Sequence, residues 1–247
     1  MLAIVDDFGA TAVEERGNSL RIFFSTTAAR DEALNVLAAT APASAIDVPD
    51  EDWARRSQEN LQPITVGRVT VIPNSTFQFP NSIVIAPSMG FGTGHHATTR
   101  LCLAALQEID LTDTFVLDVG TGSGVLAIAA DHLGAARALG IDHDPDAIQS
   151  ARENLALNPG ARHVEVEIAD LIVVELPRAD VVTANLTGAL LVRSAASLLG
   201  AVRPGGTLIL SGLLVHERDD VCRAFAPAAV VWEREEEGWI GLILSVD

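Results

Sequence analysis

From residue 98 onward, the chain alternates between two hydrophobic patterns. Short strand-like segments rich in Val, Ile and Leu alternate with longer segments that have apolar residues at helical spacing, and the connections between them are short. The predicted strands cover residues 115–119, 138–141, 164–168, 180–183 and 207–211, and the predicted helices cover 98–109, 125–133, 147–157, 189–201 and 215–225. Such alternation predicts βαβ units, and therefore a parallel sheet with helices on both faces.

The C-terminal end departs from this pattern. Residues 230–233 and 239–246 are strand-like, and only the short acidic segment 235–238 separates them. A connection of this length cannot hold a crossover helix, so the two strands must be antiparallel. The predicted fold is α/β, a doubly wound, mostly parallel seven-stranded sheet with a terminal antiparallel hairpin. We interpret the acidic tip of that hairpin as a solvated turn.

The N-terminal part has a different organisation. Its predicted elements are a hairpin of residues 11–15 and 20–24 around the turn pair Gly17-Asn18, a helix over 28–39, a strand over 45–48 and a charged helical connector over 49–60. Two further short strands, 68–72 and 83–85, lead into a glycine-rich stretch at 89–94. We therefore expect a small α+β N-terminal region with its connector, residues 1–60, and a main α/β domain, residues 61–247.

Composition and charge narrow the class of partner. The chain is 49% hydrophobic with a formal net charge of −17, and all 16 of its basic residues are arginine. No apolar run reaches the ~18–20 uncharged residues of a membrane span, and the acidic start does not resemble a secretory signal, so we expect a cytoplasmic protein without a membrane partner. A surface this acidic repels phosphate backbones and attracts basic proteins or small amines, so direct nucleic-acid binding is not expected. Oligomeric state does not follow from these patterns.

Cysteines and neighbouring histidines suggest no metal site. Cys102 and Cys222 have no CxxC spacing and are expected to be reduced, buried thiols. His95 and His96 are adjacent, but no further His or carboxylate lies at ligand spacing.

The stretch Asp118-Val-Gly-Thr-Gly-Ser-Gly124 follows an apolar strand and opens a helix. Its glycines, Gly120, Gly122 and Gly124, let the backbone turn tightly and approach a ligand. The helix beyond offers free N–H groups and positive dipole character. A GxGxG spacing led by an acid favours S-adenosylmethionine over the dinucleotides bound by GxGxxG. Asp118 is expected to order the loop and to face the cationic amine of the methionine moiety.

Two more acids follow the next strands. Asp142 ends a strand, 142 − 120 = 22 positions after Gly120, where a carboxylate accepts hydrogen bonds from both ribose hydroxyls. Asp170, after the third strand, has two interpretations: a contact to the adenine amino group, or an acid in a surface loop. Asp144 and Pro145 are interpreted as the N-cap and first residue of the following helix.

The fourth strand and the first helix of the domain add candidates for catalysis. Asn185 ends the strand in Thr183-Ala-Asn-Leu186, where its amide oxygen can accept from an amine and orient the nitrogen lone pair. Thr99, at the helix start, can cap the helix or reach the cofactor. His96 is a candidate proton acceptor through water.

These motifs together resemble the bacterial methyltransferases of the eleventh large-subunit ribosomal protein, the PrmA family. The resemblance is carried by residues 91–99, 116–124, 140–145, 151–154, 184–186, 204–206 and 210–212, and it extends from about residue 50 to the end. It implies a class I methyltransferase fold, S-adenosylmethionine as cofactor, contacts to it from Thr99, Gly120, Asp142 and Asn185, and Asn185 beside the reacting amine. The family's N-terminal domain resembles a complete ferredoxin-like unit, and we expect a trimmed one here. His95, Ala97 and Ser57 depart from the residues usual in the family.

Three functions are compatible with these residues. The preferred one is an S-adenosylmethionine-dependent N-methyltransferase acting on protein amines, a lysine or an α-amine, with a ribosomal protein as candidate substrate. The second is a small-molecule N-methyltransferase on the same fold, which a trimmed N-terminal region favours. The third is a non-catalytic S-adenosylmethionine-binding protein, and Asn185 argues against it, because mere binding requires no amine acceptor there.

Overall fold

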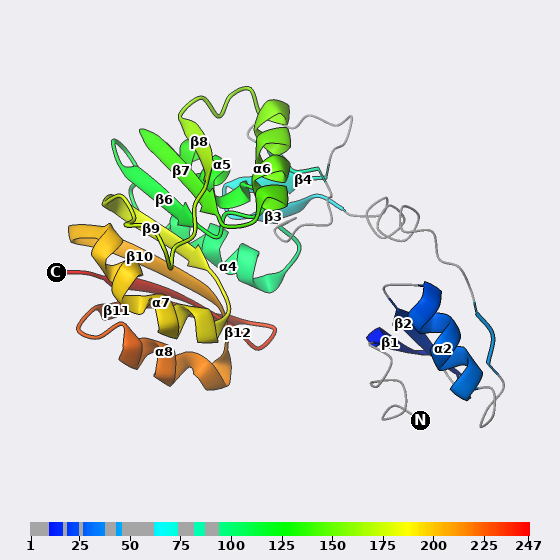
Figure 1. Cartoon of the computed structure of the whole chain (residues 1–247). Coiled ribbons are helices and arrows are strands. Elements are labelled where there is room, and N and C mark those ends of the chain that lie inside the picture. Colours follow the sequence, from blue (N-terminus) through cyan, green and yellow to red (C-terminus); the bar gives the residue numbers. More distant parts are fainter. Residues whose placement is uncertain are drawn as a thin grey trace. The chain divides into compact units, whose positions relative to one another are not determined.

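The computed structural model describes residues 10–16, 19–24, 27–37, 43–45, 62–73, 82–86 and 94–247 (Figure 1). Contacts between residues divide the chain into two units, Met1–Trp53 and Ala54–Asp247. The domain boundary predicted after residue 60 lies in a stretch outside the described residues.

The N-terminal unit is a hairpin followed by a helix. Strands β1 (Ala10–Arg16) and β2 (Ser19–Phe24) pair antiparallel, and α2 (Thr27–Leu37) follows them. Arg16 pairs with Ser19, and the predicted turn pair Gly17-Asn18 lies outside the described residues. The hairpin and the helix are confirmed. The strand predicted over 45–48 and the connector over 49–60 lie outside the described residues, except Ala45, which has no regular structure.

A seven-stranded sheet forms the centre of the second unit, in the order β11-β12-β10-β9-β6-β7-β8. Its strands are β6 (Phe115–Val119), β7 (Arg137–Asp142), β8 (Val164–Ile168), β9 (Ala179–Asn185), β10 (Val202–Leu214), β11 (Ala229–Glu236) and β12 (Trp239–Ser245). Strands β6 to β10 are parallel, whereas β12 is antiparallel to both β10 and β11. The predicted fold class and its terminal hairpin are therefore confirmed.

Helices cover both faces of this sheet (Figure 1). They are α4 (Ala97–Leu106), α5 (Val125–His132), α6 (Pro145–Leu157), α7 (Gly188–Ala201) and α8 (Arg218–Ala224). Successive residues of a strand face opposite layers. Val116 of β6 packs in the cluster that contains α4 and α5, whereas Leu117 packs in the cluster that contains α7 and α8. The apolar run of β6 in the sequence thus reflects burial on two sides.

A second, three-stranded sheet consists of β3 (Ile64–Val66), β4 (Val69–Ile72) and β5 (Ser82–Val84), in that order. The sequence predicted β4 and β5 but missed β3, which is only three residues long and shows no periodicity by itself. Val71 and Ile83 are buried in the same cluster as α4 and α5, so this sheet extends the core beside α5.

Three details at the C-terminal end differ from the prediction. Strand β10 is 13 residues long rather than five. The helix predicted over 215–225 begins as a 3₁₀ turn, η1 (Val215–Glu217), before α8. The hairpin turn is only Glu237-Gly238, with φ of +53° and +80°, a left-handed pair that joins strands in a two-residue turn.

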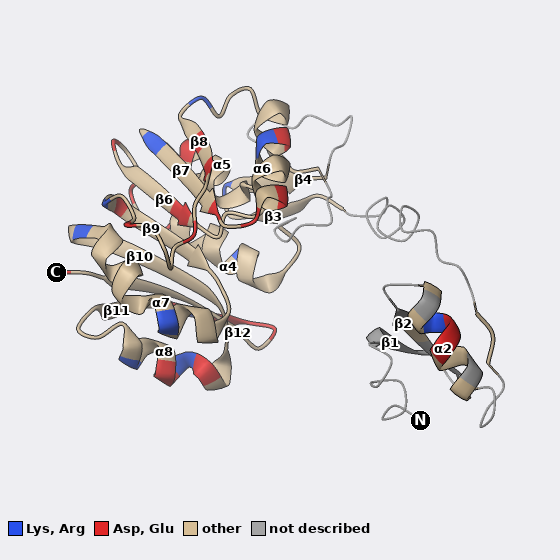
Figure 2. Cartoon of the chain, in the orientation of Figure 1, with Lys and Arg blue, Asp and Glu red and all other residues tan. Residues whose placement is uncertain are grey.

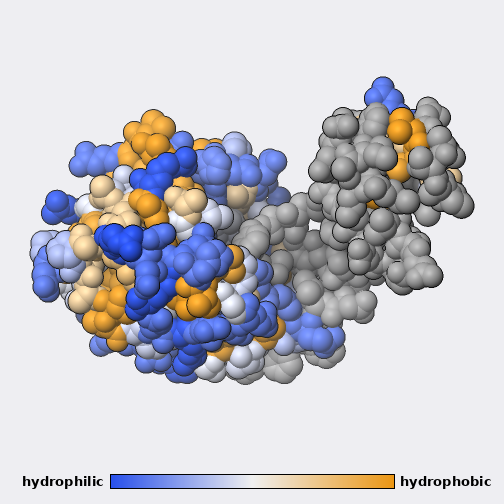
Figure 3. All heavy atoms as spheres, turned by 90° about the horizontal axis from the view of Figure 1, so that it is seen from below, coloured by the Kyte–Doolittle hydropathy of each residue, from blue (hydrophilic) through white to orange (hydrophobic). Residues whose placement is uncertain are grey.

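No described helix is both long and apolar enough to cross a membrane. Hydrophilic and hydrophobic side chains are mixed over the face shown in Figure 3.

Candidate active site

A cleft of about 1180 Å³ opens where the parallel strands end. The carboxyl ends of β6, β7 and β9, the first turns of α4 and α6, and the start of β12 line it. This is where doubly wound sheets bind their ligands. Seven of the predicted site residues line the cleft: His96, Thr99, Gly120, Gly122, Asp142, Asp170 and Asn185. Asp118 and Gly124 lie behind its wall.

The glycine loop between β6 and α5 combines two requirements. Gly120 has φ of +73°, and a Cβ there would lie 2.5 Å from Cδ2 of Leu186, across the cleft wall. Gly124 has φ of +81°, and a Cβ there would lie 3.2 Å from Cβ of Ala151 on α6. Gly120 therefore leaves room for the Leu186 side chain beside the loop, and Gly124 allows α5 to pack closely on α6.

Asp118 is a buried support of this loop, with only 1% of its surface exposed. Its two carboxylate oxygens accept hydrogen bonds of 2.6 Å from the hydroxyls of Thr121 and Thr183. Burial raises the pKa of the Asp118 carboxyl, and these hydroxyls oppose the rise. The structure agrees with the expected ordering of the loop. Asp118 itself does not line the cleft, because both of its oxygens are held by hydroxyls behind the loop. Its expected contact to the methionine amine stays a prediction.

Removing one of these hydroxyls should destabilise the fold in a pH-dependent way. Thr183→Val is expected to lower the free energy of unfolding by about 1.5–3 kcal/mol at pH 7, the range for a hydrogen bond to a charged group. The Thr183 hydroxyl lowers the pKa of Asp118, so its loss raises that pKa further. In the folded variant, the Asp118 carboxyl therefore becomes protonated at a higher pH than in the folded wild type. As the pH falls toward 4, the difference in free energy of unfolding between wild type and variant should shrink. Urea unfolding at both pH values tests this, with Thr187→Val as control. An equal deficit at both would contradict it.

Of the two thiols expected to be buried, Cys102 is buried and Cys222 is only partly buried. Cys102 and Cys222 are free, and burial followed by the nearby Asp118 charge raises the pKa of the Cys102 thiol. Cys102 therefore stays protonated and unreactive. Among the described residues, no three His, Cys, Asp or Glu side chains gather as a metal site.

Asp142 lies at the end of β7 on the rim of the glycine loop. One oxygen accepts from the backbone N–H of Gly122 at 3.1 Å and the other from that of Asp144 at 3.1 Å. These bonds fix the orientation of the carboxylate, which is mostly buried but lines the cleft. Asp144 in turn caps α6 by accepting from Asp146 N–H, as predicted.

Asp170 also reaches the cleft, beside Asp142. The Ala169 N–H donates to the Asp142 carbonyl at 2.8 Å, which holds the chain after β8 against the end of β7. One Asp170 oxygen accepts from Ile172 N–H at 2.8 Å and so shapes its own loop. Both interpretations of Asp170 thus have a structural basis, and the contact to adenine stays a prediction.

The start of α4 supplies a second wall. Thr99 is buried, and its hydroxyl oxygen has no hydrogen-bond partner among the described residues. A buried polar atom of this kind on the wall of a cleft is expected where a ligand provides the partner.

His96 is the N-cap of α4. Its Nδ1 lies 2.9 Å from Oγ1 of Thr98 and accepts from the Thr98 N–H at 3.4 Å. A ring that accepts at Nδ1 carries its proton on Nε2 when neutral. In this arrangement Nδ1 caps the helix, and the role of His96 as proton acceptor stays a prediction.

Asn185 and an unpredicted residue, Trp239, complete the cleft. Asn185 ends β9 and pairs with Ser211 of β10, whereas Trp239 begins β12 and pairs with Leu214 of the same strand. The Asn185 side chain makes no hydrogen bond to any described residue, so its amide remains available to a ligand. Trp239 packs edge-on against His96, with ring centroids 5.0 Å apart. No local pattern marked Trp239, because it reaches the cleft from the last strand.

A buried amide connects the glycine loop to the small sheet. The Asn154 side chain donates to the Ser123 carbonyl and accepts from Ala86 N–H, both at 2.8 Å. Four residues on, Asn158 bonds both the N–H and the carbonyl of Val84. The two amides thus satisfy backbone groups at the edge of β5 and just after it, where no further described strand pairs. In the sequence, Asn154 stood out only as part of the family resemblance.

Comparison with known proteins identifies the family. The profile described as Ribosomal protein L11 methyltransferase (PrmA) matches residues 11–246. Curated relatives of that name are 41% identical over 226 residues in Deinococcus radiodurans and 45% identical over 194 residues in Geobacter metallireducens. These alignments cover 87% and 76% of this chain, and 80% and 63% of the respective relatives.

A solved structure agrees with the sequence comparison. The ribosomal protein L11 methylase from Lactobacillus delbrueckii subsp. bulgaricus is 28% identical, with a TM-score of 0.70 over 76% of this chain and 100% of that one. The GxGxG loop, the unpartnered Thr99 hydroxyl and the carboxylate of Asp142 suit the cofactor that the sequence predicted. The chain is an S-adenosylmethionine-dependent methyltransferase and belongs to the ribosomal protein L11 methyltransferase (PrmA) family.

Proposed function

We propose that this enzyme methylates amine nitrogens of ribosomal protein L11, the substrate named for its relatives. The observation that carries the proposal is Asn185, whose unengaged amide lies on the wall of the cleft. An amide oxygen there suits an amine, which donates hydrogen bonds, better than a carbon or carboxylate acceptor. Ribosomal proteins are made and assembled in the cytoplasm, which is the location we propose.

We assign cofactor binding to the residues around the cleft. Thr99 would bond through its hydroxyl, Gly120 and Gly122 would admit the ligand close to the backbone, and Asp142 would accept from the ribose hydroxyls. Asp170 would accept from the adenine amino group. Asp118 and Gly124 would act from behind the wall, by holding the loop and its helix in place.

The charge around the cleft supports a cationic acceptor. Among the described residues, five carboxylates and one guanidinium, that of Arg193, line the cleft. The carboxylates belong to Asp142, Asp144, Asp146, Glu153 and Asp170. Figure 2 colours the described acidic residues of the chain red and the described arginines blue. Such a field attracts lysine side chains and repels nucleic-acid phosphates.

The reaction needs a neutral amine in the correct orientation. When bound, S-adenosylmethionine supplies an electrophilic methyl group on its sulfonium. A lysine amine has an ordinary pKa of about 10.4, and transfer into a desolvated cleft lowers it. Asn185 would accept one N–H of the neutral amine and align its lone pair, and positioning of this kind supplies much of the rate. The released proton would leave to water, and His96 would serve as an ordered wall.

A transfer assay tests the proposal. Purified enzyme, S-adenosylmethionine labelled in the methyl group and L11 from the same organism should give a labelled L11 band, and acid hydrolysis should recover the label as methylated amines. In a whole lysate, label only in the low-mass fraction would favour the small-molecule alternative. Absence of any transfer, with cofactor still bound, would favour the non-catalytic alternative.

A further inference from the structure

One guanidinium ties together three segments beside the cleft. Arg100, at the end of the first turn of α4, donates from Nε to Glu236 at 2.6 Å and from Nη2 to Glu237 at 2.8 Å. Its Nη1 donates to the carbonyl of His95. The acidic tip of the last hairpin, which the sequence suggested to be a solvated turn, is thus bound to the start of α4.

The residues next to these contacts form one wall of the cleft. His95 directly precedes His96, and Gly238 alone separates Glu237 from Trp239. The His96 and Trp239 rings meet edge-on, and both line the cleft. Arg100 does not line the cleft, so it acts on this wall only through its neighbours.

Stability alone is a weak explanation for the contact. The side chain of Arg100 is 20% exposed and that of Glu237 is 70% exposed, and ion pairs this close to solvent contribute little to stability. The forked guanidinium instead imposes geometry, because its donors are fixed in one plane. A three-way contact of this kind restricts how far α4 and the hairpin tip can move apart.

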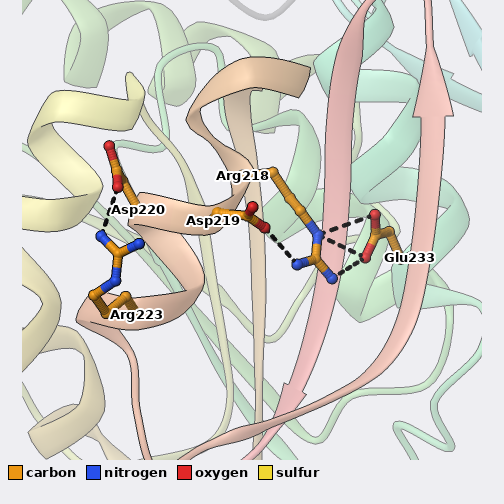
Figure 4. Close-up of polar contacts among 5 residues, drawn as sticks. All are labelled: Arg218, Asp219, Asp220, Arg223 and Glu233. Atoms are coloured by element: carbon orange, nitrogen blue, oxygen red, sulfur yellow. Dashed lines mark hydrogen bonds and ion pairs between the residues drawn. The ribbon is translucent and has the colours of Figure 1, made fainter.

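The same strand provides an internal comparison. Figure 4 shows Arg218 of α8 bound to Glu233 of β11, with its Nη2 2.8 Å from Oε2, and Asp219 also on its guanidinium. This pair also joins a helix to β11, but neither of its members lines the cleft. Trp232, adjacent to Glu233, is outside the cleft as well.

We propose that Arg100 is a positioning residue that holds the His96–Trp239 wall in register for the methyl acceptor. This inference rests on the proposed function for its kinetic part only. Asn185 and Trp239 pair with the same strand, β10, three residues apart along it, so a shift of this wall changes the space beside Asn185.

The kinetic test compares Arg100→Met with its matched control, Arg218→Met. Arg100→Met is expected to lower kcat/KM for L11 by about 10- to 100-fold, the scale of a misplaced reacting group, while the Kd for S-adenosylhomocysteine changes less than about threefold. Arg218→Met should leave kcat/KM and the Kd for S-adenosylhomocysteine within about twofold of the wild-type values. Arg100→Lys keeps the charge but not the forked guanidinium, so its loss of kcat/KM should be intermediate. This variant replaces Arg100→Met in the test if Arg100→Met does not fold. Equal losses of kcat/KM in Arg100→Met and Arg218→Met would overturn the proposal. It would also be overturned if Arg100→Met lost as much affinity for S-adenosylhomocysteine as it lost in kcat/KM.

A second arm tests whether Arg100 acts through the hairpin tip. The variant that combines Arg100→Met with Glu236→Gln and Glu237→Gln should lose little more kcat/KM than the more strongly affected of two parents. These parents are Arg100→Met and the double glutamine variant, and both break the same contact. Fully additive losses would mean that Arg100 acts independently of these glutamates, and would overturn the proposal.

A third arm does not depend on the substrate. The indole N–H resonance of Trp239, assigned with Trp239→Phe, should shift or broaden in Arg100→Met while that of Trp232 is unchanged. Arg218→Met should give the opposite result. An unchanged Trp239 resonance overturns the positioning role. If wild-type enzyme labels no L11 but these shifts occur, the proposed function fails and the positioning role stands.

Discussion

Replacing Asn185 with alanine should lower turnover by about 10²–10³, or ~3–4 kcal/mol of transition-state stabilisation. The amide lies on the cleft wall at the end of β9, and no described residue engages it. If it orients the lone pair of the attacking amine, its contribution is greatest when the nitrogen and methyl carbon are aligned. Single-turnover transfer to L11 at saturating cofactor measures this step directly.

Cofactor affinity separates the two possible roles of Asn185. Thr99, Gly120 and Asp142 remain in the variant, so the Kd for S-adenosylhomocysteine by calorimetry should change much less than turnover. Asn185→Asp is a useful comparison, since it keeps an oxygen at the same place but adds a charge. If Asn185→Ala instead loses cofactor binding and keeps its turnover at saturating cofactor, Asn185 belongs to the cofactor site alone. The amine would then be oriented from the Trp239 side.

Replacing Asp142 with alanine should weaken S-adenosylhomocysteine binding by about 1.5–3 kcal/mol, or roughly 10- to 150-fold. The carboxylate is held in place by the N–H groups of Gly122 and Asp144, so it meets the ribose without first losing rotational freedom. Its loss also leaves the Gly122 N–H, in the glycine loop, without its acceptor. Both effects weaken binding.

Asp144→Asn is the matched control for Asp142→Ala. It removes the same charge two positions away and keeps an acceptor to cap α6. If the interaction is a specific pair of hydrogen bonds, the control should bind nearly as tightly as wild type, and NAD should bind at least a hundredfold more weakly than S-adenosylhomocysteine. Similar losses in both variants would reduce the role of Asp142 to general negative charge.

The arrangement of the main sheet was accessible from the sequence because its signals are local. An apolar run marks β6, and alternation of apolar and charged residues marks the edge strand β8, and the predicted bounds of both coincide with the observed ones. Short connections between strand and helix then leave one right-handed topology. Element ends were less well predicted where tertiary pairing extends them, as in β10, which continues along β12 well beyond its apolar centre.

The same locality explains how much of the site could be predicted. Gly120, Asp142 and Asn185 each end a parallel strand or follow one, and parallel strands end at a common edge, so their convergence follows from position in the chain. The direction in which the Asp118 side chain points does not follow from its position in the chain. It depends on Thr183, 65 residues away on the neighbouring strand, whose hydroxyl competes with any ligand for the carboxylate.

Short-range patterns along the chain predicted the fold class, the family and the edge of the sheet at which the cleft opens, because they specify the strands, the helices and the short connections between them. Which side chains form the walls of that cleft became evident only from the folded molecule. Trp239 reaches it from the last strand, and Arg100 binds glutamates 136 and 137 residues away. Such contacts depend on packing between elements that are distant in sequence, and no periodicity along the chain encodes them.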